Sequence, residues 1–167
     1  MKIKTKTLVT LSIFTAIALV LSYVEALLPP IWSAVPGIKI GLPNIIIVFV
    51  LYRFSLKHAV AVSLVRILLN SLLFGNAVTL MYSLAGALLS LAVMALLKRI
   101  DRFSMVGVSV LGGVFHNLGQ ILVAMLVLET AEIGYYMIIL GITGTVAGVL
   151  VGLLGSLVLK YTAKVKF

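Results

Sequence analysis

The chain has 167 residues, of which 63% are hydrophobic and only 10% are charged. Ordinary soluble domains carry about 25% charged and about 45–50% apolar residues. The composition therefore argues against a soluble globule and predicts an integral membrane protein that forms one membrane domain over residues 1–167. The chain contains no cysteine, which excludes disulfides, thiolate metal sites, iron–sulfur clusters and covalently attached haem.

Six apolar segments follow one another along the chain and predict an all-α bundle of six transmembrane helices. At about 1.5 Å per residue, five of them reach about 27 Å or more, enough to cross a hydrocarbon core of about 30 Å. The second reaches only about 18 Å, and a Pro- and Gly-rich outer loop precedes it. The segments run over residues 7–28, 43–54, 56–73, 76–97, 104–128 and 134–159.

The basic residues predict the orientation of this bundle. The start M-K-I-K-T-K-T leads into an apolar run that continues to Leu28 without a small-residue cleavage site, which indicates a retained first helix. Both termini are expected on the cytoplasmic side of the cell membrane, because eleven of the thirteen Lys and Arg residues then lie inside. The net charge of +9 therefore reports topology and does not indicate a nucleic-acid partner.

Two polar stripes interrupt the apolar segments. Arg66 lies near the middle of the third span, where a charged side chain costs roughly 2.5–3.5 kcal/mol and usually faces the bundle interior or a substrate path. Ser63, Arg66 and Asn70 recur at i, i+3 and i+7, on one face of a helix. The fifth span carries a second stripe within about 140° of arc, formed by Ser109, Gly112, Gly113, His116, Asn117 and Gln120.

Helix rise places these polar residues at similar depth. Arg66 and Asn70 lie about 15–21 Å above the inner end of their span, and His116 and Gln120 about 18–24 Å above theirs. We expect them to form a substrate-binding site in the outer half of the membrane. Interhelical hydrogen bonds without a ligand are the alternative, above all for Asn70 and Ser83. The same level is reached by Tyr82, Ser83, Ser22 and Glu25, the last of which could also be an interfacial carboxylate.

The stretch P-G-I-K-I-G-L-P-N, residues 36–44, indicates the start of the second helix on the outer side. Pro43 suits the first helical turn, where its missing N–H costs nothing. The free amides of that turn, together with Lys39 and Asn44, form a candidate anion site, since a helix N-terminus attracts negative charge. A plain surface loop followed by a helix is the alternative.

Small residues at GxxxG-type spacing predict close helix packing, either inside the bundle or against a partner helix. Gly144, Gly148 and Gly152 form two such steps in register in the sixth span. The pairs Ser12/Ala16 and Ala18/Ser22 form weaker steps in the first span.

Several motifs in order along the chain resemble the Gx transporter family, also described as heptaprenyl diphosphate synthase component I. They are G-I-K-I-G-L-P-N (37–44), L-Y-R-F (51–54), V-R-I-L-L-N-S-L-L-F-G (65–75), Y-S-L-A-G-A-L-L-S (82–90) and G-V-S-V-L-G-G-V-F-H-N-L-G-Q (107–120). That family is in turn similar to the substrate-binding S-components of energy-coupling factor (ECF) transporters. The resemblance implies a six-helix bundle with an outward-facing site for a vitamin-like, flavin or isoprenoid-related molecule. It also implies partners: an ECF-type transmembrane subunit with ATPases, or a flavin- or quinone-handling protein.

Three functions remain open. The first is a substrate-binding or transport subunit without catalysis, cofactor or metal of its own; because the chain has no G-x-x-x-x-G-K-[ST] motif, ATP energy would come from partners. The second is an accessory subunit of polyprenyl diphosphate or quinone synthesis. Catalysis of prenyl transfer is not expected, since Asp101 is the only aspartate and no carboxylates cluster to hold Mg²⁺. The third is a membrane subunit of a flavin- or quinone-linked electron-transfer system.

Overall fold

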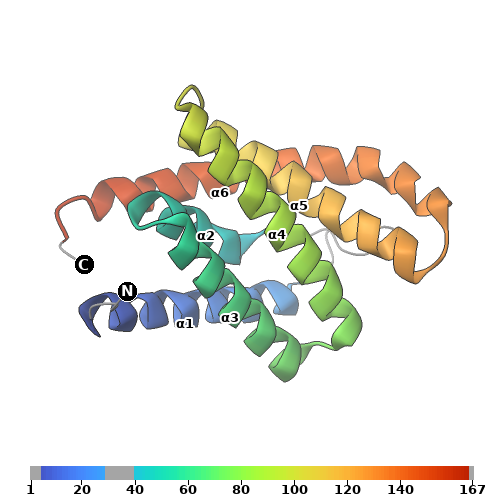
Figure 1. Ribbon diagram of the computed structural model, residues 1–167, viewed down its shortest axis with the longest axis horizontal. Coiled ribbons are helices and arrows are strands. Elements are labelled where there is room, and N and C mark those ends of the chain that lie inside the picture. Colours follow the sequence, from blue (N-terminus) through green and yellow to red (C-terminus); the bar gives the residue numbers. More distant parts are fainter. Residues whose placement is uncertain (1–4, 29–39, 166–167) are drawn as a thin grey trace.

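The computed structural model describes residues 5–28 and 40–165, and within these ranges the chain consists of helices joined by short turns and contains no strand. The helices lie on the six apolar segments expected from the sequence, and a 3-10 helix, η1, precedes the last of them (Figure 1). The elements are α1 (Thr5–Leu27), α2 (Leu42–Arg53), α3 (Leu56–Phe74), α4 (Ala77–Ile100), α5 (Met105–Val127), η1 (Ala131–Tyr136) and α6 (Met137–Tyr161).

Local sequence sets where several helices begin. The Asn76 side chain accepts a hydrogen bond from the Thr79 amide at 2.9 Å, and the Thr79 hydroxyl accepts one from the Asn76 amide, which makes a capping box at the start of α4. The Ser104 hydroxyl likewise accepts from the Gly107 amide at 3.1 Å and caps α5. Short links then join α3, α4 and α5 as antiparallel neighbours.

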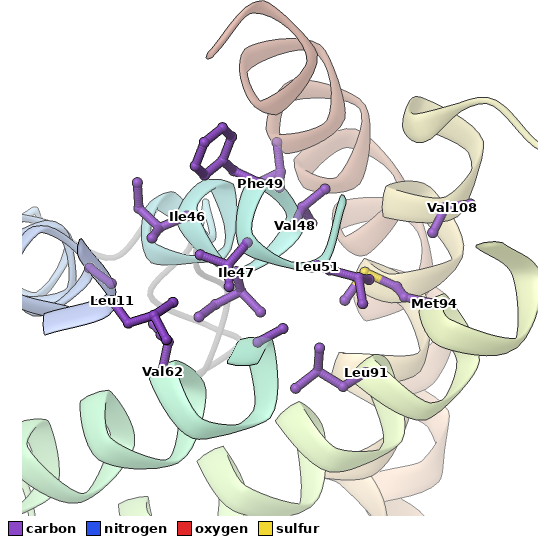
Figure 2. Packing of buried hydrophobic residues seen from close by; sticks show 14 residues of the cluster. Leu11, Ile46, Ile47, Val48, Phe49, Leu51, Val62, Leu91, Met94 and Val108 are labelled. Atoms are coloured by element: carbon purple, nitrogen blue, oxygen red, sulfur yellow. The ribbon is translucent and has the colours of Figure 1, made fainter. Parts of the chain in front are cut away.

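The short helix α2 forms the centre of the apolar core. Its residues from Ile46 to Leu51 are all buried, so every side of the helix is covered. Helices α1, α3 and α6 pack around it, and Figure 2 shows its side chains beside Leu11, Val62 and Met94 of the surrounding helices. A helix that is apolar all round is stable only when it is enclosed, which explains why α2 shows no polar face in the sequence.

Charged side chains hold both ends of α2. At its N-terminal end, the Glu25 carboxylate of α1 accepts hydrogen bonds from the amides of Gly41 and Leu42. At its C-terminal end, Lys98 Nζ of α4 donates to the Leu51 carbonyl at 2.7 Å and lies 4.9 Å from the centre of the Tyr52 ring. A negative group at the start and a positive group at the end both match the helix dipole.

The outside of the helical assembly is apolar. Within residues 5–28 and 40–165, five helices are long and apolar enough to cross a membrane, and α2 is a shorter apolar helix. Large hydrophobic side chains are exposed on these helices, for instance Leu72 at 81%, Leu126 at 78% and Ile138 at 73%. Such surfaces are stable in lipid and not in water, so the chain is a multi-pass membrane protein.

The glycines of α6 allow it to approach α5 closely. A Cβ atom built on Gly148 would lie 2.5 Å from the Val110 Cα atom, and one on Gly152 would lie 2.7 Å from the Val106 Cα atom. A Cβ on Gly144 would lie 3.0 Å from the Gly113 carbonyl oxygen. These glycines therefore pack against a neighbour inside the chain, and the backbone contact is too close for any side chain.

The small residues of α1 divide between two environments. Ala18 and Ser22 are buried and face the rest of the molecule. Ser12 and Ala16 are exposed, and the Ser12 hydroxyl donates to the Leu8 carbonyl of its own helix at 3.0 Å. Only the Ser12/Ala16 step therefore remains accessible to a partner helix.

The close α5–α6 contact predicts opposite outcomes for two alanine substitutions in the same helix. Gly148→Ala forces α5 and α6 apart, and we expect the thermal unfolding midpoint in detergent to fall by about 5 °C or more. Gly141→Ala is the matched control: a Cβ there meets nothing within 4 Å, and alanine favours the helix. A midpoint for Gly148→Ala equal to that of the control contradicts this packing.

Candidate functional site

A polar cavity of about 100 Å³ lies between the helices, and each of the six α-helices contributes to its wall. Its floor and sides also contain apolar atoms, from Val48 of α2, Met94 of α4 and Val151 of α6 among others. What distinguishes the cavity from the core is the number of polar side chains that line it: Ser22, Glu25, Asn44, Arg66, Asn70, Ser83, Ser90, Ser109, His116, Asn117 and Gln120.

Most of the residues singled out in the sequence as candidate ligand contacts meet at this cavity. Two do not. Tyr82 is half-buried but lies outside the lining, because the helix turns by about 100° per residue and presents the neighbouring Ser83 instead. Lys39 lies outside the described residues. The candidates that share the cavity are Glu25, Asn44, Arg66, Asn70, Ser83, His116, Asn117 and Gln120.

Arg66 is the buried cation of the cavity. The residue is only 8% exposed, and within the described part of the chain its guanidinium makes one hydrogen bond, from Nη1 to the Ser22 hydroxyl at 3.3 Å. Its Nε atom is buried and has no hydrogen-bond partner among the described residues. A guanidinium carries five N–H donors, so most of its hydrogen-bonding capacity is unused by the protein.

Asn70 lies one helical turn above Arg66 on α3 and also lines the cavity. Its Oδ1 atom is buried, and no described residue donates to it. A buried polar atom without a partner costs about 1–3 kcal/mol. Arg66 and Asn70 therefore each carry a destabilising buried polar atom, at adjacent turns of the helix that forms one wall of the cavity.

The polar residues of α5 are held by close contacts with α4 and α6. The Asn117 amide nitrogen donates to the Leu140 carbonyl of α6 at 2.7 Å, so part of its side chain serves an interhelical contact. On the other side, a Cβ on Gly86 of α4 would lie 3.1 Å from both the His116 ring and the Gln120 side chain. Gly86 thus leaves the space in which these two side chains lie against α4.

The free amides expected at the start of α2 are engaged within the protein. The amides of Gly41 and Leu42, which we expected to meet an anionic ligand, donate to Glu25, the second at 3.4 Å. The Asn44 amide donates to the Gly41 carbonyl at 2.9 Å. The physical reason is that α1 ends beside the start of α2, so its own carboxylate reaches these donors first.

The sequence indicated the α5 side of the inner part of the cavity, through the stripe that begins at Ser109, but not the α4 side. Ser90 and Met94 of α4 line the inner part beside Ser109 of α5, and the distance from Ser109 to Gln120 is about 16 Å along the helix. A sequence signal did exist: Ser83, Ser90 and Met94 are spaced at i, i+7 and i+11, which places them on one helix face. The part of the cavity wall that α6 forms could not be predicted from polar residues, because it consists of glycines, Ala147 and Val151.

Comparison with known proteins assigns the chain to a family. Residues 14–158 match the family model described as heptaprenyl diphosphate synthase component I. The chain belongs to this family. The resemblance seen in the ordered motifs is thereby confirmed over most of the sequence, and the match includes α2 to α5 and every helix segment that lines the polar cavity. No curated protein and no solved structure matches the chain.

The contact between Glu25 and α2 predicts a ligand-independent effect on stability. Glu25→Ala leaves the amides of Gly41 and Leu42 without an acceptor, and we expect the unfolding midpoint in detergent to fall by about 5 °C. Glu25→Gln keeps an acceptor oxygen and should retain most of the stability. Glu132→Ala, at an exposed carboxylate on η1, is the control. Unchanged stability of Glu25→Ala without added ligand would exclude the capping role.

Proposed function

We propose that this family member is a substrate-binding or transport subunit of the cell membrane, and that it holds a small molecule with a polar or anionic head group in the polar cavity. The observation that carries the proposal is Arg66: a buried arginine with an unpartnered Nε, lining a cavity in a membrane protein. Charged residues inside membrane spans commonly mark substrate paths.

The charges around the cavity favour a ligand acceptor at Arg66. Glu25 lines the same cavity, but its carboxylate accepts hydrogen bonds from two amides of α2, and no carboxylate of the described residues forms an ion pair with Arg66. A buried charge is tolerated when it is paired or hydrogen-bonded. A bound carboxylate, phosphate or carbonyl oxygen would supply what the described part of the chain does not.

In this proposal the chain catalyses no reaction and needs no cofactor of its own. Any ATP-driven step is assigned to partner proteins, because the sequence contains no phosphate-binding G-x-x-x-x-G-K-[ST] motif. An ECF-type module with ATPases is one such partner, and a flavin- or quinone-handling protein is another. The exposed Ser12/Ala16 step on α1 is the place where a partner helix could approach closely.

The family description favours a second candidate function. A protein described as a component of heptaprenyl diphosphate synthase could serve as an accessory membrane subunit that holds a polyprenyl diphosphate for a catalytic partner. The diphosphate is an anion that suits Arg66. Catalysis itself is not assigned to this chain, because Asp101 is its only aspartate, lies at the C-terminal end of α4 and is not among the residues that line the cavity with Glu25.

We further propose six membrane spans with both termini in the cytoplasm. The start of α1 and the end of α6 lie at the same end of the molecule (Figure 1). The basic residues Arg53, Lys98 and Lys160 occupy the last turns of α2, α4 and α6, the helices that would run inward. A C-terminal green fluorescent protein fusion should therefore fluoresce, and a C-terminal alkaline phosphatase fusion should be inactive. The reverse pattern would overturn the orientation.

Replacement of Arg66 tests the binding function directly. Native mass spectrometry of the gently purified protein should show a bound small molecule, and Arg66→Ala should lose it, because removal of one partner of a buried charged hydrogen bond costs about 2–5 kcal/mol, or roughly thirtyfold or more in affinity. Arg102→Ala, which removes an exposed arginine between α4 and α5, should retain the molecule.

The same experiment separates the two candidates. A released vitamin-like or heterocyclic molecule supports the substrate-binding subunit, and a released polyprenyl diphosphate supports the accessory role in prenyl diphosphate synthesis. Circular dichroism and size-exclusion chromatography establish that Arg66→Ala is folded. Equal ligand occupancy in the folded Arg66→Ala variant and the parent protein would refute the site.

A further inference from the structure

The polar cavity comes close to the end of the molecule at which α4 ends and α5 begins. On α5 it is lined as far as Ser109, which lies about 6 Å from the first residue of the helix, Met105. On α4 it is lined as far as Met94, about 9 Å from the last residue, Ile100. Only a thin layer of side chains therefore separates the cavity from the side that we propose to be cytoplasmic.

This layer, the inner floor of the cavity, is formed by Met94, Lys98 and Met105. Residues at i and i+4 stand on one face of a helix. Lys98 therefore follows Met94 on the cavity-facing side of α4, and Met105 precedes Ser109 on the cavity-facing side of α5. The faces of both helices that line the cavity thus continue into the inner floor.

Both methionines of the inner floor lie against glycines of the next helix. A Cβ atom on Gly112 of α5 would lie 2.6 Å from Met94 Sδ, and one on Gly155 of α6 would lie 3.0 Å from Met105 Cε. Met94 is only 4% exposed and lies in the buried cluster with Leu51 of α2 (Figure 2). Methionine is unbranched and has three rotatable side-chain bonds, so both side chains can leave these positions by rotation, without any helix unfolding.

Lys98 joins the inner floor to the end of α2. Its Nζ atom donates to the Leu51 carbonyl at 2.7 Å and lies 4.9 Å from the centre of the Tyr52 ring. The last carbonyls of a helix have no partner within the helix, so this one can exchange the lysine for water when α2 and α4 separate. The contact is therefore a reversible link between α2 and α4.

Two buried hydroxyls beside the inner floor distinguish it from the rest of the apolar core. Ser90 is 7% exposed and Ser109 is 3% exposed, and both line the cavity. No hydrogen bond joins either hydroxyl to another described residue, whereas the buried Ser22 hydroxyl donates to the Ala18 carbonyl at 2.9 Å. A buried hydroxyl is costly unless it is hydrogen-bonded. These two are placed to meet water or polar groups that move along the cavity toward the inner floor.

We propose that the polar cavity has an exit between α2, α4 and α5, on the side of the α4–α5 turn, and that Met94, Lys98 and Met105 close this exit as a gate. The inference rests on the proposed binding and transport function and assigns the release step to helices of this chain. Rotation of the two methionines and loss of the Lys98–Leu51 contact open the gate. The structure is its closed state.

Cysteine accessibility tests the gate, because the chain contains no cysteine of its own. The reporter is Ser109→Cys, in protein reconstituted in sealed vesicles of uniform orientation. The membrane-impermeant reagent methanethiosulfonate ethylsulfonate is added on one side or the other. The exposed positions Arg102→Cys, between α4 and α5, and Glu132→Cys, on η1, identify the two sides. We expect the reporter to react far more slowly than Arg102→Cys when the reagent is on the side of the α4–α5 turn.

Two substitutions should open the gate and accelerate the reaction of Ser109→Cys from that side. Lys98→Met removes the donor at similar length, and we expect a rate about tenfold or more higher, the change in open population that loss of one charged hydrogen bond gives. Met94→Ala removes the side chain that lies on Gly112 and should act in the same direction. The matched controls Lys160→Met and Met81→Ala, at exposed positions of α6 and α4, should leave the rate unchanged.

Three results would overturn the inference. They are a reporter that already reacts as fast as Arg102→Cys, a rate that neither Lys98→Met nor Met94→Ala raises, and an equal rise from both sides of the membrane, which indicates general loosening. Size-exclusion chromatography and thermal unfolding establish that each variant is folded, and either variant alone is sufficient for the test. Failure of the proposed function is a separate observation, since it is measured by retention of the copurifying molecule in Arg66→Ala.

Discussion

The enclosed helix α2 is the constraint on which the arrangement depends. A twelve-residue helix that is buried on every side must be surrounded by others, and α1, α3 and α6 provide that enclosure. Its ends are fixed by Glu25 and Lys98, whose charges complement the helix dipole. Because α2 is short, it fills the core without filling the space beside its N-terminal turn. Pro43, Asn44 and Val48 form part of the wall of that space, the polar cavity.

Close packing on the other side of the cavity has a different origin. Helices α4, α5 and α6 approach through glycines such as Gly119, Gly148 and Gly152, where a Cβ atom would meet neighbouring backbone at less than 3 Å. In lipid, helices gain little from the hydrophobic effect and associate through such close backbone contact. On α5, Gly112 and Gly113 lie on the same stripe as the polar side chains and also contact neighbouring helices closely. The same stripe therefore both packs the helices and turns His116, Asn117 and Gln120 toward the cavity.

The sequence predicted those parts of the structure that follow from hydropathy and helical periodicity. The apolar segments lie on the observed helices, and the i, i+3, i+7 spacing around Arg66 together with estimated depth led to the residues that meet at the cavity. Long-range contacts could not be read in this way. The capping of α2 by Glu25 depends on where the C-terminal end of α1 lies relative to α2. The glycines of α6 have the same sequence spacing whether they pack against a helix of this chain or against a helix of another protein. Tyr82 shows the limit of estimates by depth, because depth alone does not say which face a residue occupies.

Glu25 and Arg66 are opposite charges that line one cavity and attract each other without forming a direct ion pair. A direct ion pair would satisfy both groups and close the site to a charged or polar ligand. Here the carboxylate is engaged by the amides of Gly41 and Leu42, so its negative charge stabilises the start of α2. The guanidinium keeps only the Ser22 hydroxyl, at 3.3 Å. The short helix thus has a second consequence beyond the space it leaves: its first amides engage the Glu25 carboxylate, and Arg66 forms no ion pair among the described residues.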